Sequence, residues 1–345
     1  MTSSLVIQTS FLGDTVLTTP LLAYLAERGP VDIVVTAASA PLLANNPAVR
    51  EIVAYDKRGA DRGVRGFLRL ARRVGEDRYD SAYLAQGSVR SAALALAARI
   101  PRRIGFQTSA GRRLYTESVV APDNDHHAAR LLRLAMAGDG VEPTREMLRP
   151  RLYPGDVERG MVDELLAHAG VHGEPYVALA PGSVWATKRW PYYAELARRL
   201  ARHSRLVVIG SAADTPLAGV IVEAAGDRAI DATGRLSLLA SAELIGRARA
   251  LVTNDSSPLH LASAMGTPTV AIFGPTVPEF GFGPLAPTSR VAGRAELACR
   301  PCDRHGPQRC PLGHWRCMRE ITPDHLAALL DDLVAASPPR PTPAP

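Results

Sequence analysis

Lysine is almost absent from this chain. Of its 40 basic side chains only Lys57 and Lys188 are lysines, so arginine supplies the other 38. Against 34 acidic residues this leaves a formal net charge of +6. That modest charge leaves acidic substrates, anionic membrane surfaces and nucleic acid open as partners. Nucleic acid is the weakest of the three, because the basic residues are spread along the chain and aromatic residues make up only 5% of it.

Long apolar runs are also missing. No stretch approaches the roughly 18 to 20 apolar residues that a membrane-spanning helix needs. The first residues, MTSSLVIQTSFLGD, show no basic segment followed by a long apolar one, so we expect a cytoplasmic protein. Cysteine is scarce, and all four cysteines fall within one segment, 299–317. In a reducing compartment this crowding favours reduced thiols or a bound metal over disulfides.

The common nucleotide-binding signatures are absent as well. The sequence contains neither G-x-G-x-x-G nor G-x-x-x-x-G-K-[ST], and it shows no repeat at the periods of solenoid proteins. What is present is an ordinary globular composition, with 46% apolar and 21% charged residues over 345 positions. That length is typical of two domains.

Short β-rich apolar runs alternate with segments of helical period, which predicts an α/β protein with parallel sheets. In the first half we predict strands at 5–8, 32–36, 52–55 and 81–84, helices at 15–27, 62–74, 89–98 and 126–137, and an irregular, strand-like segment at 100–122. In the second half we predict strands at 176–180, 206–209, 229–231, 251–253 and 269–273, and helices at 192–202, 216–225, 238–247, 257–265 and 323–335.

Proline and glycine between 142 and 155 indicate a linker. We therefore expect an N-terminal domain over 1–150, a C-terminal domain over 151–336, and a disordered Pro-rich tail over 337–345. Two doubly wound domains that face each other would leave a cleft between them.

Asp14 follows the first predicted strand, in the turn FLGDT at 11–15 that leads into the first helix. Ligands of α/β sheets bind at this edge, where the carboxyl ends of the strands lie. A carboxylate here can serve as a base toward a bound hydroxyl, but Asp is also a favoured helix cap. The spacing alone leaves both roles open.

A second candidate is the loop APGS at 180–183 followed by TKRWP at 187–191, after the first strand of the second domain. A glycine-containing loop with hydroxyls and cations at a helix start suits a phosphate. Because the composition otherwise avoids lysine, Lys188 indicates a site that needs a compact, flexible ammonium. The alternative is chance retention, since Lys57 is also present.

A third candidate is TNDSSPLHLA at 253–262, which has the form of a strand end, a small-residue turn and a helix. Backbone amides with the hydroxyls of Ser256 and Ser257 would hold a second phosphate, and Asp255 would accept from a sugar hydroxyl. The alternative is an ordinary helix cap with His260 packed on the sheet. Beside the Lys188 loop on an adjacent strand, that alternative is the weaker one.

Three other clusters have competing explanations. Cys299, Cys302, Cys310 and Cys317 would hold structural zinc tetrahedrally, or they are reduced thiols in an irregular loop, or they form a disulfide after purification. The D-N-D run at 123–125 has the form of a D-x-D metal motif, but helix capping explains it better. The last cluster is either a solvated helix face or a surface for anionic lipid, and consists of Lys57, Arg58, Arg62, Arg65, Arg69, Arg72 and Arg73.

Together these motifs resemble glycosyltransferase family 9, the ADP-heptose:lipopolysaccharide heptosyltransferases, and within it the heptosyltransferase II branch. The resemblance covers nearly the whole chain. It rests on LGD at 12–14 with TTPLL at 18–22, PGS at 181–183 with KRWP at 188–191, TGRLSL at 233–238, NDSS at 254–257 with HLA at 260–262, and CPLGH at 310–314 with CM at 317–318.

The resemblance implies a GT-B architecture of two Rossmann-like domains, in which the N-terminal domain binds the acceptor and the C-terminal domain the nucleotide sugar. It implies an inverting transfer of heptose from ADP-heptose to the inner core of lipopolysaccharide. By motif, Asp14 matches the general base and Lys188 the residue that meets the diphosphate. Asp214 matches a carboxylate near the ribose, and Leu236 a position near the adenine. The donor-binding set would be Ser183, Thr187, Lys188, Asp214, Leu236, Asp255, Ser256, Ser257 and His260.

This reading requires no cofactor, because an ammonium and a helix N-terminus can stabilise a departing diphosphate without a divalent metal. Zinc would then be structural only. A lipid A-linked acceptor implies peripheral work at the cytoplasmic face of an inner membrane, with no nucleic acid partner. Two alternatives remain open: a sugar-nucleotide epimerase or hydrolase of the same architecture, which needs no acceptor, and a non-catalytic nucleotide-sugar-binding module in which Asp14 is only a cap.

Overall fold

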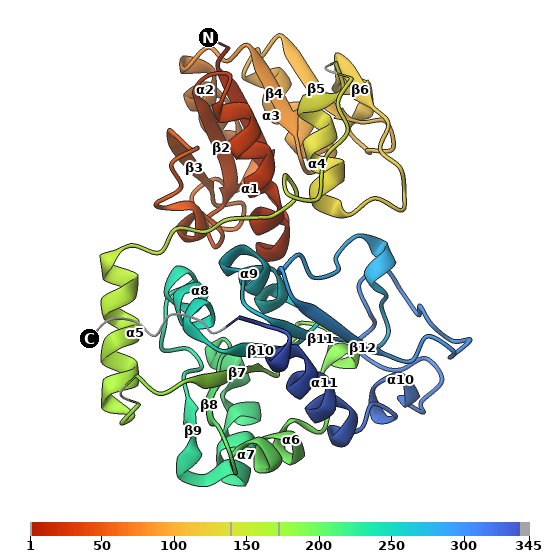
Figure 1. Ribbon diagram of the computed structural model, residues 1–345. Helices are drawn as coiled ribbons and strands as arrows, with labels where there is room; N and C mark the ends of the chain where they lie inside the picture. The colour runs from red at the N-terminus through yellow and green to blue at the C-terminus, as the bar shows by residue number, and fades with distance from the viewer. Residues whose placement is uncertain (1, 139, 172, 339–345) are drawn as a thin grey trace. The chain divides into compact units, whose positions relative to one another are not determined.

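The chain divides into two compact units, Met1–Tyr153 and Pro154–Pro345 (Figure 1). The computed structural model describes residues 2–138, 140–171 and 173–338. The division falls within the Pro- and Gly-rich segment predicted as a linker. Each unit is built around a parallel six-stranded sheet, as the alternating sequence pattern predicts. No helix within the described ranges combines the length and the apolar composition that a bilayer crossing requires.

In the N-terminal unit the strand order is β3-β2-β1-β4-β5-β6, and every neighbouring pair is parallel. The strands are β1 (Ser4–Gln8), β2 (Val31–Thr36), β3 (Glu51–Tyr55), β4 (Ser81–Leu84), β5 (Arg102–Phe106) and β6 (Glu117–Val119). The helices are α1 (Leu12–Ala26), α2 (Gly63–Glu76), α3 (Val89–Ala97) and α4 (His127–Met136), with short 3-10 turns at Ala40–Leu43 and Arg112–Leu114.

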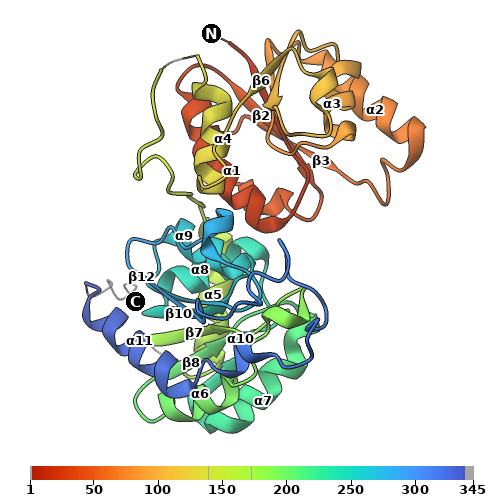
Figure 2. The same ribbon diagram turned by 90° about the vertical axis from the view of Figure 1, so that its right-hand side faces the viewer.

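Helices cover both faces of this sheet, with α1 and α4 on one side and α2 and α3 on the other (Figure 2). On the α1 side Leu22 packs with Ile33, and on the α2 side Leu70 and Leu94 pack with Val34. Because both faces are buried, the central strands are continuous apolar runs rather than alternating ones.

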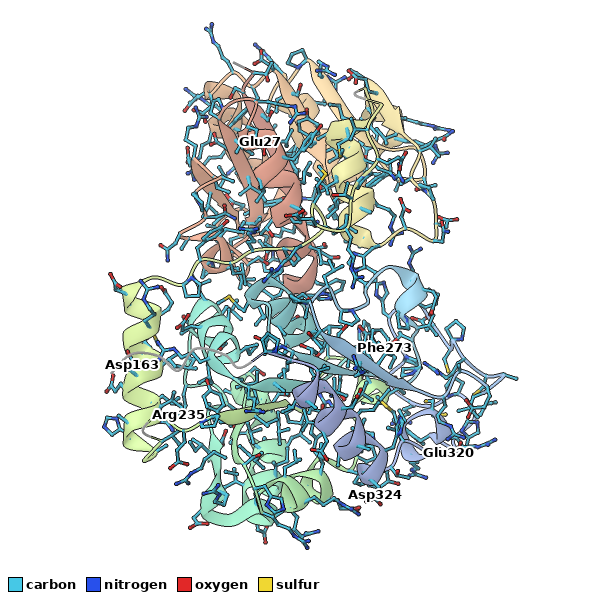
Figure 3. The ribbon with its side chains drawn as sticks, viewed as in Figure 1. Glu27, Asp163, Arg235, Phe273, Glu320 and Asp324 are labelled. Carbon is cyan, nitrogen blue, oxygen red and sulfur yellow. The ribbon has the colours of Figure 1, made fainter. Side chains whose placement is uncertain are left out.

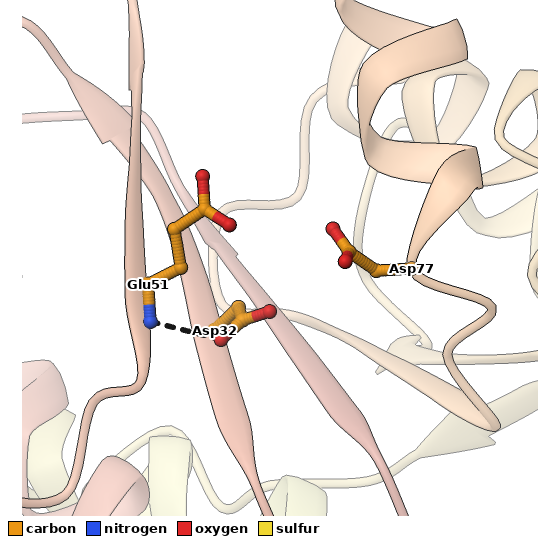
Figure 4. A group of neighbouring side chains, drawn as sticks. All are labelled: Asp32, Glu51 and Asp77. Carbon is orange, nitrogen blue, oxygen red and sulfur yellow. Dashed lines mark hydrogen bonds between the residues drawn. The ribbon is translucent and has the colours of Figure 1, made fainter.

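A buried carboxylate stands near the amino end of β2. Asp32 is fully buried, and it accepts hydrogen bonds from Arg50 Nε at 3.0 Å and from the Tyr79 hydroxyl at 2.6 Å. It also accepts from the Glu51 N–H at 2.9 Å (Figure 4). Arg50 adds a second, bidentate contact through its terminal nitrogen. Burial, together with the neighbouring Asp32 carboxylate, raises the pKa of the Tyr79 phenol well above its usual value.

Three carboxylates, those of Asp32, Glu51 and Asp77, each place an oxygen within 4.8 Å of the others. Among the described residues no other three His, Cys, Asp or Glu side chains meet this spacing for a shared metal ion. The Asp32 oxygens are already filled by protein donors, and Arg73 pairs with Glu51 at 2.7 Å. Since arginines already pair with Asp32 and Glu51, we interpret this group as a structural network of the fold.

Replacing Asp32 by asparagine is expected to destabilise the N-terminal unit by about 2 kcal/mol, because an amide nitrogen in place of Oδ2 cannot accept from Arg50 or from the buried Tyr79 hydroxyl. Glu51→Gln is the matched control. It breaks only the half-exposed pair with Arg73 and should cost about 0.5 kcal/mol or less. Urea unfolding of both variants measures the difference, and equal losses would contradict the network.

In the C-terminal unit the strand order is β12-β11-β10-β7-β8-β9, again all parallel. The strands are β7 (Tyr176–Ala180), β8 (Arg205–Val208), β9 (Ala229–Asp231), β10 (Ala250–Asn254), β11 (Thr269–Phe273) and β12 (Ser289–Gly293). The helices are α5 (Asp156–His168), α6 (Tyr193–Leu200), α7 (Thr215–Ala225), α8 (Leu238–Arg247), α9 (Ser257–Met265), α10 (Arg316–Arg319) and α11 (Pro323–Ala335). The 3-10 turns are Ala186–Lys188, Ala212–Asp214, Gly226–Arg228 and Pro278–Phe280.

Side chains from α6, α7 and α11 join those of the strands in the main core of this unit. On the other side of the sheet α9 contributes Leu259, which packs against Phe273 of β11. The long helices predicted from the sequence for this unit are thus confirmed.

Both sheets share one topology. Counted from its own first strand, each sheet has the order 3-2-1-4-5-6 of a doubly wound Rossmann-like fold. In this topology the strand order reverses between strands 1 and 4, and ligands bind outside the carboxyl ends of the strands at that switch point. The switch point lies between β1 and β4 in the N-terminal unit and between β7 and β10 in the C-terminal unit.

Several local features differ from the prediction. Helix α5 was not predicted, and it attaches to α8 through an ion pair of Arg247 with Asp163 (Figure 3). Strand β12 was not predicted either, because only Ala292 of this edge strand is buried and its pairing with β11 is non-local. Ser337 closes the last helix by donating to the Leu333 carbonyl at 2.7 Å, whereas residues 339–345 of the expected tail lie outside the described residues.

The predicted capping role of the D-N-D run is wrong. The N-cap of α4 is His126, whose Nδ1 accepts from the Ala128 N–H at 3.2 Å. Asp125 instead forms an ion pair with Arg133 at 2.6 Å, nearly two turns into the helix, and so ties the preceding turn to α4. An arginine within reach attracts this carboxylate more strongly than the helix amides do.

Candidate active site

Asp14 lies in the first turn of α1, directly after β1 and therefore at the switch point. Its Oδ2 accepts hydrogen bonds from the Ser10 hydroxyl at 2.8 Å and from the Phe11 N–H at 3.2 Å, so this oxygen caps the helix. Its Oδ1 lies 3.4 Å from Nε2 of His127, and both side chains are less than 20% exposed. One carboxylate therefore combines the capping role with a second oxygen that faces an imidazole.

Sequence reasoning missed His127. This residue opens α4, more than a hundred positions after Asp14, and only the packing of α4 along α1 brings it to the end of β1. The local signal was the pair of adjacent histidines at 126 and 127, which no motif singled out.

Lys57 also reaches this edge of the sheet. It follows β3, and its ammonium donates to the Thr9 carbonyl at 2.8 Å. Burial, and then the nearby charge of Arg90, lower the pKa of Lys57. Thr9 in turn donates through its hydroxyl to Gln86 Oε1 at 3.3 Å, after β4. The carboxyl edge of the N-terminal sheet therefore carries a carboxylate, an imidazole, a lysine and an amide.

In the C-terminal unit two residues that the sequence placed on separate loops form one ion pair. Lys188 Nζ donates to Asp255 Oδ2 at 2.6 Å, and the Thr276 hydroxyl donates to the same oxygen at 2.6 Å. The Lys188 and Asp255 side chains are only 10% and 9% exposed. Because Lys188 follows β7 and Asp255 follows β10, the pair lies at the switch point of the second sheet.

Asn254 fixes the geometry around this pair. Its side-chain amide donates to the Pro181 carbonyl at 2.8 Å, and its Oδ1 accepts from the Trp190 N–H at 3.2 Å. Asn254 is fully buried, so both ends of its amide are used within the protein. It therefore ties both ends of the loop that carries Lys188 to the end of β10.

A loop at 303–308, which the sequence did not indicate as part of the site, covers the Lys188 loop. Gly306 has a φ of +87°, and a Cβ there would lie 3.2 Å from Lys188 Cε, so glycine fits this position on both grounds. Thr187 donates through its hydroxyl to the Pro307 carbonyl, and Gln308 Oε1 accepts from the Ala186 N–H at 3.1 Å. The Thr187 hydroxyl is thus engaged by this loop.

Asp214 and Leu236 lie on the two neighbouring strand ends. Asp214 Oδ2 accepts from the N–H of Ser211 at 2.9 Å and from its hydroxyl at 2.8 Å. Gly182 packs directly on this carboxylate, since an added Cβ would lie 2.4 Å from Asp214 Oδ1. Leu236 is half-buried in the turn after β9. The Gly234 N–H of this turn donates to the Gly210 carbonyl at 3.0 Å, which joins the turn to the loop that carries Asp214.

The remaining predicted residues differ in exposure. Ser183 is half-buried, and its hydroxyl accepts from the Trp185 N–H at 3.3 Å. Ser256 and Ser257 are half-buried at the start of α9, where Ser256 is the N-cap but makes no side-chain capping hydrogen bond. His260 is buried with its ring edge-to-face against Phe282 at 6.2 Å. The start of α9 therefore presents backbone amides and two hydroxyls beside the Lys188–Asp255 pair, a combination that suits an anion.

The four cysteines have different environments. Cys317 is buried in the main core, and burial raises the pKa of its thiol to about 11. Burial also raises the pKa of Cys302. At Cys310 burial acts in the same direction, but backbone amides of residues 312–315 outweigh it and lower the pKa of the thiol. All four cysteines are unpaired with one another, and no three of these described thiols meet the 4.8 Å spacing of a shared metal ion.

The chain is similar to known heptosyltransferases along most of its length. The profile of the family "Glycosyltransferase family 9 (heptosyltransferase)" matches residues 67–313. The chain is 34% identical to lipopolysaccharide heptosyltransferase 1 of Pseudomonas aeruginosa, covering 86% of this chain and 85% of that protein. It is 31% identical to lipopolysaccharide heptosyltransferase 2 of Escherichia coli K12, covering 83% and 86%.

Among solved structures, E. coli ADP-heptose lipopolysaccharide heptosyltransferase II superposes with a TM-score of 0.78 at 27% identity, covering 97% of this chain and 99% of that one. The two Rossmann-like sheets, the ordered motifs and these relatives agree. They give no support to the epimerase, hydrolase or binding-module alternatives. The chain belongs to glycosyltransferase family 9, the heptosyltransferases, and is a glycosyltransferase.

Proposed function

We propose that this enzyme transfers heptose from ADP-heptose to the inner core of lipopolysaccharide, with inversion at the anomeric carbon, as a heptosyltransferase II-like enzyme. The observation that carries the proposal is the Lys188 ammonium, which Asp255 holds beside the start of α9, because the ammonium and the helix amides can donate to a nucleoside diphosphate as it leaves. The similarity both to heptosyltransferase 1 and to heptosyltransferase 2 proteins supports the donor class.

In this proposal the C-terminal unit binds the donor. Lys188 meets the diphosphate together with the amides and hydroxyls at Ser256 and Ser257, while Asp255 holds the ammonium in place. Asp214 lies beside the ribose and Leu236 beside the adenine, on the strand ends next to the ion pair. Ser183, Thr187 and His260 complete the donor set by shaping the two loops.

The N-terminal unit binds the acceptor, and Asp14 is the general base. The acceptor hydroxyl attacks the anomeric carbon and gives its proton to the Asp14 carboxylate. The bond from that carbon to the diphosphate oxygen breaks, and ADP leaves with the electron pair. The neighbouring His127 holds the Asp14 oxygen that is not used for capping, and so orients the base.

Neither step calls for a divalent metal, because the leaving diphosphate is stabilised by a preorganised ammonium and a helix N-terminus. Structural zinc on Cys299, Cys302, Cys310 and Cys317 stays a prediction. It requires the 299–317 loop to draw the thiols together. Elemental analysis of the purified protein tests it, and about one zinc per chain, lost in Cys302→Ser, would bear it out.

We further propose that the enzyme works in the cytoplasm, in peripheral contact with the inner face of the inner membrane. A lipid A-linked acceptor is held in that membrane, and heptosyl transfer to it needs no nucleic acid partner. The names of the relatives as lipopolysaccharide heptosyltransferases support this location.

The test is a transfer assay read by mass spectrometry, with ADP-heptose and a heptose-terminated inner-core acceptor. We expect the acceptor to gain the mass of one heptose, equally with and without EDTA. Loss of transfer in EDTA, restored by a divalent ion, would contradict the metal-free mechanism. Release of sugar from ADP-heptose at the full rate without acceptor would instead indicate a hydrolase.

A further inference from the structure

The outer face of α2 carries an unusual combination of exposed apolar and basic side chains. Val64 is 74% exposed and Leu68 is 55% exposed, and their spacing of four residues places them on one stripe of the helix. The exposed arginines on α2 and at its N-cap are Arg62, Arg65, Arg69, Arg72 and Arg73. Such a helix, with an exposed apolar stripe beside a row of arginines, is typical of segments that lie in the interface of a lipid bilayer.

Only part of this positive charge is compensated within the protein. Arg73 pairs with Glu51 at 2.7 Å, while Arg69 and Asp61 lie 3.7 Å apart. Arg72 and Glu76 are also 3.7 Å apart and largely exposed, so this pair is weak. Within the residues that the structure describes, Arg62 and Arg65 form no ion pair.

A groove of about 850 Å³ adjoins the stripe, between the C-terminal ends of α2 and α3, which lie side by side (Figure 2). Leu68 and Arg72 line it from α2. Arg78, directly after α2, and Arg99, directly after α3, line it from the loops. The apolar stripe, the helix arginines and the groove therefore form one continuous surface, which we call the α2–α3 face.

Arg78 and Arg99 both adopt a left-handed backbone, with φ of +48° and +58°. Helices commonly end in this conformation, and the residue there is usually glycine because a side chain makes it unfavourable. Here both helix ends carry arginine instead, and both side chains line the same groove. The groove is lined by three arginines and by two acidic residues, Glu76 and Asp80, so positive charge is in excess there.

We infer that the α2–α3 face docks the protein onto an anionic phospholipid surface, with Val64 and Leu68 entering the interface and the groove arginines meeting lipid phosphates. The inference rests on the proposed function, since a lipid-linked acceptor requires membrane contact. Charge complementarity favours an anionic bilayer over a protein partner, because arginines on an amphipathic helix gain affinity from a negatively charged leaflet.

The experiment is vesicle flotation of the full chain with phosphatidylcholine alone and with 70:30 phosphatidylcholine:phosphatidylglycerol. Wild type should float only with the anionic vesicles, and less so at high salt. Arg78→Gly with Arg99→Gly should weaken binding about thirty-fold, at about 1 kcal/mol per charge. Glycine suits both backbone positions, so this variant loses charge without strain.

The matched control is Arg198→Gln with Arg202→Gln, which removes the same charge from an exposed stretch of the C-terminal unit and should change binding less than two-fold. Val64→Ser with Leu68→Ser should weaken binding about ten-fold, through loss of apolar burial. Equal binding to both vesicle types, or equal loss in the control and the glycine variant, would overturn the inference.

A water-soluble, delipidated acceptor separates this inference from the proposed function. The glycine variant should transfer heptose to the soluble acceptor at the wild-type rate while failing to float. If neither the wild type nor the variants transfer heptose, the proposed function is wrong. Flotation still tests, in that case, whether the α2–α3 face binds anionic membranes.

Discussion

Asp14→Asn is expected to lower the rate of heptose transfer by about a hundred- to ten-thousand-fold, the usual contribution of a positioned general base. The asparagine side chain keeps an oxygen that can accept from the Ser10 hydroxyl and the Phe11 N–H, so the cap of α1 is retained. It cannot accept a proton from the acceptor. Binding of ADP-heptose should be unchanged, because Asp14 belongs to the N-terminal unit.

Asp14→Ala separates capping from catalysis. It removes the cap as well as the base, so it should lose about as much activity as the asparagine variant and in addition about 1 kcal/mol of stability. Turnover numbers, donor affinity by calorimetry and urea unfolding are measured for both variants. If Asp14→Asn keeps wild-type turnover, Asp14 is a helix cap and the base is another group.

Lys188→Met is expected to have the second large effect. It should weaken ADP-heptose binding by roughly ten- to a hundredfold through the loss of charge-assisted hydrogen bonds. It should slow transfer as well, because the charge on the departing diphosphate is then less stabilised. It should also destabilise the C-terminal unit by about 3 to 5 kcal/mol, because the buried Asp255 carboxylate loses its cation.

The double variant Lys188→Met with Asp255→Asn distinguishes these effects. Without a buried charge to compensate, it should recover most of the lost stability but none of the donor affinity. Recovery of both would mean that the pair only supports the fold. Wild-type affinity and rate in Lys188→Met would reduce Lys188 to a structural residue.

The strand and helix pattern was accessible from sequence because buried parallel strands are uninterrupted apolar runs, as in β1 and β7. Elements that are held in place by residues far away in the sequence could not be predicted in this way. Strand β12 has one buried residue and exists through its ladder with β11. Helix α5 contains Gly160 and begins directly after the Pro-rich linker, which obscured its period.

The candidate site shows the same division. Motif position placed Asp14, Lys188 and Asp255 at strand ends, but the direct contact between Lys188 and Asp255 depends on β7 and β10 being neighbours. Likewise His127 and the loop at Gly306 reach the site through packing between segments far apart in the chain. Such contacts follow from strand order and helix packing, which no local pattern encodes.

The scarcity of lysine gives the protein an unusual chemical handle. Lys57 and Lys188 are its only lysines, and each lies at the carboxyl edge of a different sheet. Reductive methylation with a ¹³C-labelled reagent would therefore place one side-chain reporter in each unit. Since Lys188 is buried against Asp255, its methylation rate also reports how often that ion pair opens, without any engineered label.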